Sequence, residues 1–206
     1  DIRWSGIYAD WDINTTLAWH KSFIPITFQQ GNNVLFDHYG INGSVNNLTV
    51  NLTGSLSPGS VTVYSGSDYI FTGTGSLTGV MQLVKSGNGT ITINNTNTFS
   101  GATSIWDGAL LINNTYSSPV TVRGGTWGGI NAKGMAGGRL GGNGTIIANL
   151  TVEEKGAIIP GAGMGAVGTL NVQGNVVLNK SSYCGFDISN TPAGPKDQIL
   201  ITGNLN

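Results

Sequence analysis

The acidic residues are the first side chains of this sequence to consider for chemistry, because clustered carboxylates perform acid-base catalysis or hold Ca²⁺. Ten acids occur in 206 residues. From residue 41 onward they are Asp68, Asp107, Glu153, Glu154, Asp187 and Asp197. These six follow no common spacing that would align them on one face, and Glu153-Glu154-Lys155 is typical of a solvated turn. The pair Asp10-X-Asp12 offers two carboxylates, which seldom suffice for Ca²⁺.

Histidine and serine give no stronger indication of catalysis. His20 and His38 lie 18 residues apart, and no His-Glu pair has metal-ligand spacing. A catalytic Ser-His-Asp triad is still possible, since the members of a triad lie far apart in sequence, but no Gly-X-Ser-X-Gly motif occurs. We therefore expect no enzyme in this chain, with no catalytic residue, no metal site and no cofactor.

The densest glycine stretch runs from Gly124 to Gly144, with Arg123 directly before it and Arg139 within it. Glycine beside cations suggests a phosphate cradle, but such a loop precedes a helix, and no helical pattern follows here. The stretch is better interpreted as a protruding loop or a tight corner. Trp127 with Arg123 and Arg139 is our first candidate for partner contact, because exposed Trp and Arg are typical interface anchors.

Residues 1–40 are rich in large aromatic side chains, among them Trp4, Trp11 and Trp19. These three tryptophans are candidates for contact with a glycan, as a carbohydrate-stacking surface. The alternative, which we favour, is a hydrophobic plug over the open end of a repeat stack, because terminal repeats need a cap. Residues 1–40 are thus an aromatic-rich cap or the first coils, and residues 41–206 form the repeats.

Composition excludes several classes of function. The net charge of −1 and the pI of about 6.1 give no electrostatic basis for binding nucleic acid or an anionic membrane. No apolar run approaches the length of a membrane span. Cys184 is the one cysteine, so neither an internal disulfide nor a thiolate cluster can form. Because the chain starts at Asp1 and stops at Asn206 within an apparent strand pattern, we expect it to be a piece of a longer parent.

Short β-branched runs separated by Gly, Asn, Ser or Pro indicate an all-β chain. Runs of this kind already occur at 24–28 and 34–36. The candidate strands that follow are 48–52, 61–64, 69–72, 81–85, 90–93, 102–105, 109–112, 120–122, 126–130, 145–148, 150–152, 157–159, 169–172, 175–178, 185–188 and 198–202.

Repetition among these runs favours stacked coils over a sandwich or a barrel. Gly-Asn-Gly-Thr-Ile occurs at 87–91 and again at 142–146, and Val61-Thr62-Val63 returns as Val120-Thr121-Val122. At roughly 20 to 25 residues per coil the chain would make about eight to ten rungs, a rod of roughly 40 to 50 Å. Asn-rich corners suit this design, since Asn tolerates left-handed backbone.

The segment from Leu83 to Leu110 carries a family resemblance. Leu83-Val84-Lys85-Ser86-Gly87-Asn88-Gly89-Thr90-Ile91 is followed by Asn97-Thr98-Phe99-Ser100-Gly101 and Gly108-Ala109-Leu110. This resembles the autotransporter-associated β-strand repeat, with Phe99 for the usual Tyr and Ala109 for the usual Thr. Weaker similarity extends over roughly residues 40–203. The resemblance implies a right-handed parallel β-helix, or β-solenoid, exported by a Gram-negative bacterium.

These observations together predict a non-catalytic passenger segment, secreted or held at the cell surface through a part of the parent outside this sequence, that serves as a scaffold or adhesin-type binding rod. Its partner would be a host surface protein or a polysaccharide, with end-to-end or lateral self-association as a further option. One alternative is a carbohydrate-active β-helix of polysaccharide-lyase type, or its glycan-binding accessory domain. Another is a secreted effector that engages a host receptor.

Overall fold

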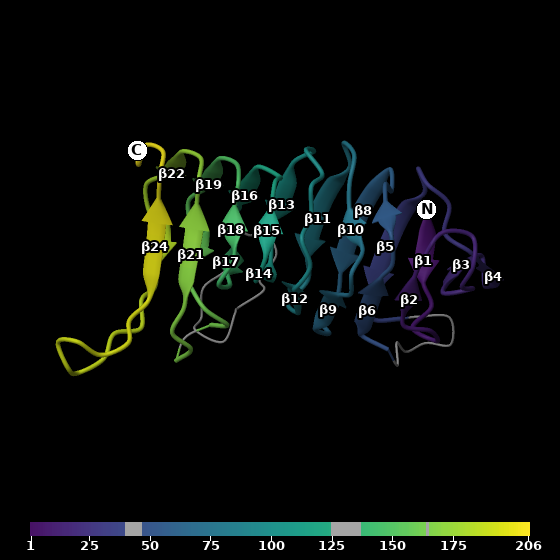
Figure 1. The fold of residues 1–206 in the computed structure, drawn as a ribbon, viewed down its shortest axis with the longest axis horizontal. Coiled ribbons are helices and arrows are strands. Elements are labelled where there is room, and N and C mark those ends of the chain that lie inside the picture. Colours follow the sequence, from purple (N-terminus) through teal and green to yellow (C-terminus); the bar gives the residue numbers. More distant parts are fainter. Residues whose placement is uncertain (40–46, 125–136, 164) are drawn as a thin grey trace.

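The computed structural model describes residues 1–39, 47–124, 137–163 and 165–206. Every regular element in these ranges is a β-strand, and most strands pair in parallel. Figure 1 shows them side by side along the long axis, with the N-terminus near one end of the molecule and the C-terminus near the other. The all-β fold with parallel sheets predicted from the sequence is therefore confirmed. No helix long and apolar enough to cross a membrane is found in the described ranges.

The largest sheet has ten strands in the order β22-β19-β16-β13-β11-β8-β5-β1-β3-β4. Its antiparallel pairs are β1 with β3 and β3 with β4, both at the N-terminal edge. The strands are β1 (Ile2–Trp4), β3 (Trp19–Lys21), β4 (Ile24–Ile26), β5 (Asn33–Asp37), β8 (Ser60–Tyr64), β11 (Gln82–Ser86), β13 (Thr103–Ile105), β16 (Val120–Val122), β19 (Leu150–Val152) and β22 (Val176–Leu178).

The second sheet has eight parallel strands in sequence order, and a third side is built from shorter ones. The second sheet contains β2 (Asp10–Trp11), β6 (Thr49–Leu52), β9 (Tyr69–Thr72), β12 (Thr90–Ile93), β14 (Gly108–Ile112), β17 (Gly138–Gly141), β20 (Ala157–Ile158) and β23 (Tyr183–Cys184). The third side contains the pair β7 (Ser55–Leu56) and β10 (Ser76–Leu77), then β15 (Thr115–Tyr116), β18 (Thr145–Ile146), β21 (Thr169–Val172) and β24 (Gln198–Ile201).

The chain visits these three sides in rotation. After β11 in the first sheet come β12 in the second and then Asn97, whose N–H donates to Thr115 O on the third side, before β13 returns to the first sheet. From β5 onward, register partners in neighbouring parallel strands are separated by as few as 17 residues, from Thr103 to Val120, and as many as 30, from Val120 to Leu150. The repeat therefore varies in length at its corners while the strands stay in register.

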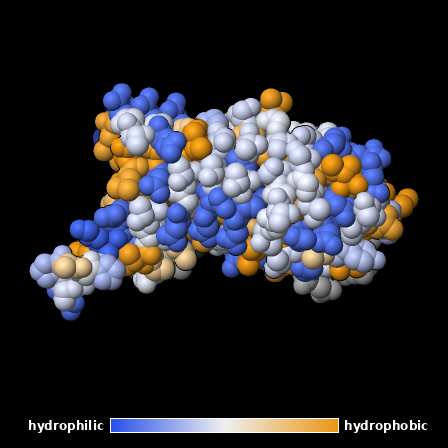
Figure 2. Space-filling view, viewed as in Figure 1, coloured by the Kyte–Doolittle hydropathy of each residue, from blue (hydrophilic) through white to orange (hydrophobic). Residues whose placement is uncertain are grey.

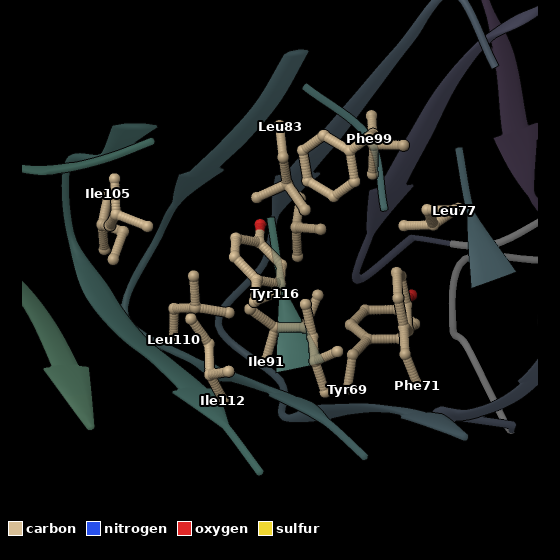
Figure 3. Packing of buried hydrophobic residues seen from close by; sticks show 14 of the residues in the cluster. Tyr69, Phe71, Leu77, Leu83, Ile91, Phe99, Ile105, Leu110, Ile112 and Tyr116 are labelled. Atoms are coloured by element: carbon tan, nitrogen blue, oxygen red, sulfur yellow. The ribbon is translucent and has the colours of Figure 1, made fainter. Parts of the chain in front are cut away.

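The core lies between the sides and is built from residues that alternate along each strand. In β12 both isoleucines are buried and both threonines face outward, as the period of two in a strand requires. Stacked strands place like residues above one another: Ile91 pairs with Tyr69 on one side and Leu110 on the other, and all three are 0% exposed. Figure 3 shows these side chains converging from different strands.

The N-terminal end differs from the rest in topology. β1 pairs parallel with β5, but its other edge is covered by β3, and β3 and β4 form an antiparallel hairpin. Trp4 and Trp19 meet edge to face there, with ring centroids 5.1 Å apart. The same aromatic cluster includes Trp11, Phe28, Phe36 and Phe71. Large rings thus fill the interior where the parallel stack begins.

Most predicted strands of the repeat region occur within a residue or two of their predicted bounds, but 185–188 is wrong. The strand lies at Tyr183–Cys184, and Ile188 takes part only in an isolated antiparallel bridge with Lys196. The physical reason is the Asp197 carboxylate, which accepts hydrogen bonds from the N–H groups of Asp187 and Gly168 and closes a local hairpin. The predicted strand 126–130 lies outside the described residues.

Candidate functional site

A row of outward-facing side chains lies where the strands of the first sheet end. Tyr64 pairs in register with Ser86, and the next coils continue the row with Trp106, Arg123 and Glu153. Backbone hydrogen bonds hold it in line, because Trp106 N donates to Lys85 O, Arg123 N to Ile105 O and Glu153 N to Val122 O. We call Trp106, Arg123 and Glu153 the ridge triad.

The ridge triad is held together by two contacts of Arg123. Its guanidinium carbon lies 4.6 Å from the centre of the Trp106 ring, within the range of a cation–π interaction. Its Nη1 atom lies 2.8 Å from Glu153 Oε1. Trp106 is 37% exposed, and the side chains of Arg123 and Glu153 are 30% and 36% exposed. The three side chains therefore present an ordered, partly exposed surface that spans three consecutive coils.

Arg139 lies in the second sheet rather than on the ridge. It pairs with Ala109 on one side and Ala157 on the other, and its guanidinium lies against Gly163. Burial lowers the pKa of Arg139, and the attraction of Asp68 opposes that shift. Gly138 N donates to Arg123 O, so the end of β16 lies beside the start of β17, and Arg139 belongs to the second sheet while Arg123 follows a strand of the first. Trp127 lies outside the described residues.

The three tryptophans proposed for glycan contact are interior residues. Trp4, Trp11 and Trp19 are each 0% exposed, and the Nε1 atom of Trp4 donates to Asn47 O at 3.1 Å. A glycan needs an exposed ring face for stacking, so these positions offer no surface for it in this conformation. Sequence reasoning missed Trp106, which is exposed, although its position directly after an inward-facing Ile105 was a usable signal.

Asp10 and Asp12, the two carboxylates considered for Ca²⁺, take part in separate hydrogen bonds. Asp10 accepts from the Asn51 amide at 2.7 Å, and Asp12 accepts from Thr16 at 2.6 and 2.8 Å. Within the described ranges no group of three or more His, Cys, Asp or Glu side chains has the geometry to hold a metal ion. These carboxylates fix turns and strand ends.

Fold and surface together define an all-β protein in which parallel strands stack in register and turns and ridges face outward. Residues 83–112 match the family described as Passenger-associated-transport-repeat. This match confirms the resemblance to the autotransporter passenger repeat, and it spans β11, β12, β13 and β14. A search of curated proteins found no match. The repeat indicates a passenger-type domain and with it a secreted or surface location.

Proposed function

We propose that this chain is a right-handed parallel β-helix that acts without catalysis as the rod of a passenger domain, presenting side chains to a partner outside the cell. The observation that carries the proposal is the rotation of the chain through three sides, with strands kept in register from β5 to β22. Such a stack is stabilised by contacts between neighbouring coils alone. It can therefore display loops and ridges without a separate core for each of them.

The rod would reach its location as part of a longer parent that anchors it to the bacterial outer membrane. The surface in Figure 2 is largely hydrophilic or neutral over the middle of the molecule, and hydrophobic residues gather toward the two ends. The face shown in Figure 2 thus suits contact with solvent. This supports a role as a spacer or adhesin-type rod, with contact made at particular places.

The ridge triad is the proposed place of contact with a host surface protein. Trp and Arg dominate the binding energy of many interfaces, and Arg123 is already ordered by Trp106 and Glu153, which reduces the entropy lost on binding. Adhesion or recognition by a protein is therefore a better match to this surface than turnover of a substrate.

The test is binding of the purified chain to a panel of host cells and glycan arrays, with the double variant Trp106→Ala, Arg123→Ala. The matched control is Thr92→Ala, on the outer face of the second sheet. We expect the double variant to reduce cell binding at least tenfold, about 1.4 kcal/mol, and the control to leave it unchanged. Equal binding by both variants would refute the ridge triad as the contact surface.

The same panel separates the alternatives. Turnover of an acidic polysaccharide, detected by the ultraviolet absorbance of unsaturated products, would place the chain among carbohydrate-active β-helices. Saturable binding to one purified receptor, with no adhesion of cells lacking it, would support the secreted effector.

A further inference from the structure

We propose that the N-terminal hairpin forms a binding site for an acidic monosaccharide unit, with Arg3 and Lys21 facing its carboxylate, His20 a hydroxyl and Phe23 the apolar face of the sugar ring. The site is independent of the ridge triad and lies at the N-terminal end of the rod, next to β3 and β4 in Figure 1. Four observations converge on it: a cavity, a pair of cations, an unpartnered buried imidazole and a strained exposed aromatic ring.

The cavity has a volume of about 300 Å³ and lies on the outer face of β1 and β3. Arg3, His20, Lys21, Phe23 and Leu35 are among its lining residues. Its size is at the lower end for small-molecule clefts. A single sugar unit or a chemical group of similar size fits this scale better than a nucleotide or a lipid.

Two cations and one carboxylate, that of Asp1, line the cavity. Arg3 Nε lies 3.2 Å from Asp37 Oδ2, and the Asp37 side chain is 4% exposed. This buried carboxylate holds the guanidinium at its Nε atom. An arginine fork held in this manner suits a planar carboxylate, and Lys21 adds a second positive charge at the solvent edge.

His20 pairs in register with Arg3 across the β1–β3 ladder, so both side chains lie on the same face. His20 is 5% exposed, and its Nε2 atom has no hydrogen-bond partner among the described residues. Burial, together with the nearby charge of Arg3, lowers the pKa of His20 against the opposing effect of Asp37. A neutral imidazole can accept from or donate to a ligand hydroxyl, and such a bond would satisfy a group that is costly to leave unpaired.

Phe23 supplies the apolar side of the site. It is 75% exposed, and its ring stacks near His20 with centroids 6.2 Å apart and 20° between the planes. An exposed side chain of this kind changes rotamer within nanoseconds, so the ring can adjust to a ligand. One aromatic face beside cations and a hydrogen-bonding imidazole is the combination that an acidic sugar requires, since such a sugar offers an apolar C–H face, a carboxylate and hydroxyls.

The backbone at this hairpin indicates that Phe23 is retained for something other than stability. Ser22 and Phe23 form the two-residue turn between β3 and β4, with φ of 50° and 67°. Turns with positive φ at both positions strongly favour Asn-Gly, and a bulky aromatic residue there is an outlier. Strain of this kind is found preferentially at functional sites.

Because of this strain, one substitution can remove the Phe23 ring without a loss of stability. Phe23→Gly removes the ring and at the same time relieves the backbone, so the fold is expected to keep or raise its melting temperature. Ser22→Asn also relieves strain but keeps the ring, and it serves as the matched control. Lys21→Gln removes one cation from the exposed edge and leaves the hairpin intact.

The experiment is an NMR titration of the chain and the three variants with glucuronate, galacturonate and N-acetylneuraminate, each compared with glucose, benzoate and inorganic phosphate. We expect saturable binding of at least one acidic sugar with a Kd of about 1 mM, typical of a ligand with few non-hydrogen atoms. Phe23→Gly should weaken it at least tenfold, Lys21→Gln severalfold, and Ser22→Asn should leave it unchanged.

The opposite results are equally clear. Failure of all three acidic sugars to saturate the chain would overturn the proposal. Unchanged affinity in Phe23→Gly would overturn the role of the ring. Equal binding of phosphate would reduce the site to a general anion site, and equal binding of benzoate would show that an aromatic acid, rather than a sugar, is the better match.

Discussion

The middle of the rod and its N-terminal end solve the same packing problem with different side chains. In the middle, one interior position is occupied from coil to coil by Val63, Lys85, Ile105 and Val122. At the N-terminal end the same row continues with Phe36 and Trp4. A middle coil has a neighbour on both sides, whereas an end coil must close the interior by itself. Large rings and a folded-back hairpin provide that closure.

This difference predicts that substitutions in the aromatic cluster at the N-terminal end cause the largest loss of stability. Trp11 packs against Trp19, Phe28, Phe36 and Phe71, with centroid distances of 5.1 to 6.1 Å. Trp11→Ala should therefore reduce the free energy of unfolding by about 3–5 kcal/mol. Ile91→Val, which removes one methyl group within the aliphatic ladder, should cost about 0.5–1.5 kcal/mol. Urea unfolding of both variants measures this contrast, and equal losses would contradict it.

The next largest loss of stability is expected where a glycine lets the backbones of neighbouring coils approach closely. Gly142 has a φ of +104°, and a Cβ there would overlap the backbone N and O of Ile112 on the preceding coil. Gly54 has a φ of +78° but faces open space. We expect Gly54→Ala to cost about 1–2 kcal/mol for its left-handed backbone alone and Gly142→Ala about 3 kcal/mol or more. Thermal unfolding checks the order of the two.

Lys85, a buried residue in the middle of the rod, should make the free energy of unfolding depend on pH. Its amine is 0% exposed and donates to Ser86 O, Gly87 O and Asp107 O, and desolvation lowers its pKa to about 8 against the opposing charges of Asp107 and Asp68. Between pH 8 and 10 the unfolded chain binds this proton more fully than the folded chain. The free energy of unfolding should therefore rise by about 2 kcal/mol relative to Lys85→Met over that range.

Two buried tyrosines set the upper limit of the pH range in which Lys85 can be measured by itself. Burial raises the pKa of Tyr69 and of Tyr116, so above about pH 10 the unfolded chain loses phenolic protons that the folded chain keeps. Their contribution to stability falls as the pH rises further. Urea titrations at pH 8, 9 and 10 isolate the lysine, and a flat difference from Lys85→Met would contradict its depressed pKa.

The ridge triad should have the smallest effect on stability. The Arg123–Glu153 ion pair is partly exposed, and pairs of that kind contribute about 0–1 kcal/mol. Glu153→Gln should thus change the unfolding midpoint little while it frees Arg123 on one side. A loss well above 1 kcal/mol, measured by urea unfolding, would show that the triad holds neighbouring coils together.

The sequence predicts the middle of the rod well because local pattern and tertiary role coincide there. Thr90-Ile91-Thr92-Ile93 alternates in the sequence and in the structure, and its parallel neighbours repeat the alternation. The family match at residues 83–112 includes this strand. A period of two shows which face is buried, and repetition shows which strands pair.

The N-terminal end is less predictable because its strands are short and aromatic. The sequence favours a hydrophobic plug for the three tryptophans but leaves a glycan platform open, and the packing around Trp19 decides for burial. The ridge triad was missed in part for a related reason. Trp106 and Glu153 are 47 residues apart and meet Arg123 only because coils of unequal length end at the same edge.

The most direct test of the stacked rod is a set of electron-spin distances along one outward row of the first sheet. Thr62 is separated from Thr151 by four strand-to-strand steps and from Val177 by five. With Cys184 replaced by Ser, nitroxide labels at Thr62 and either partner should give narrow distributions near 19 and 24 Å, an increase of about 4.8 Å per coil. Distances that do not increase from Thr151 to Val177, or broad distributions for both, would contradict the register on which the fold depends.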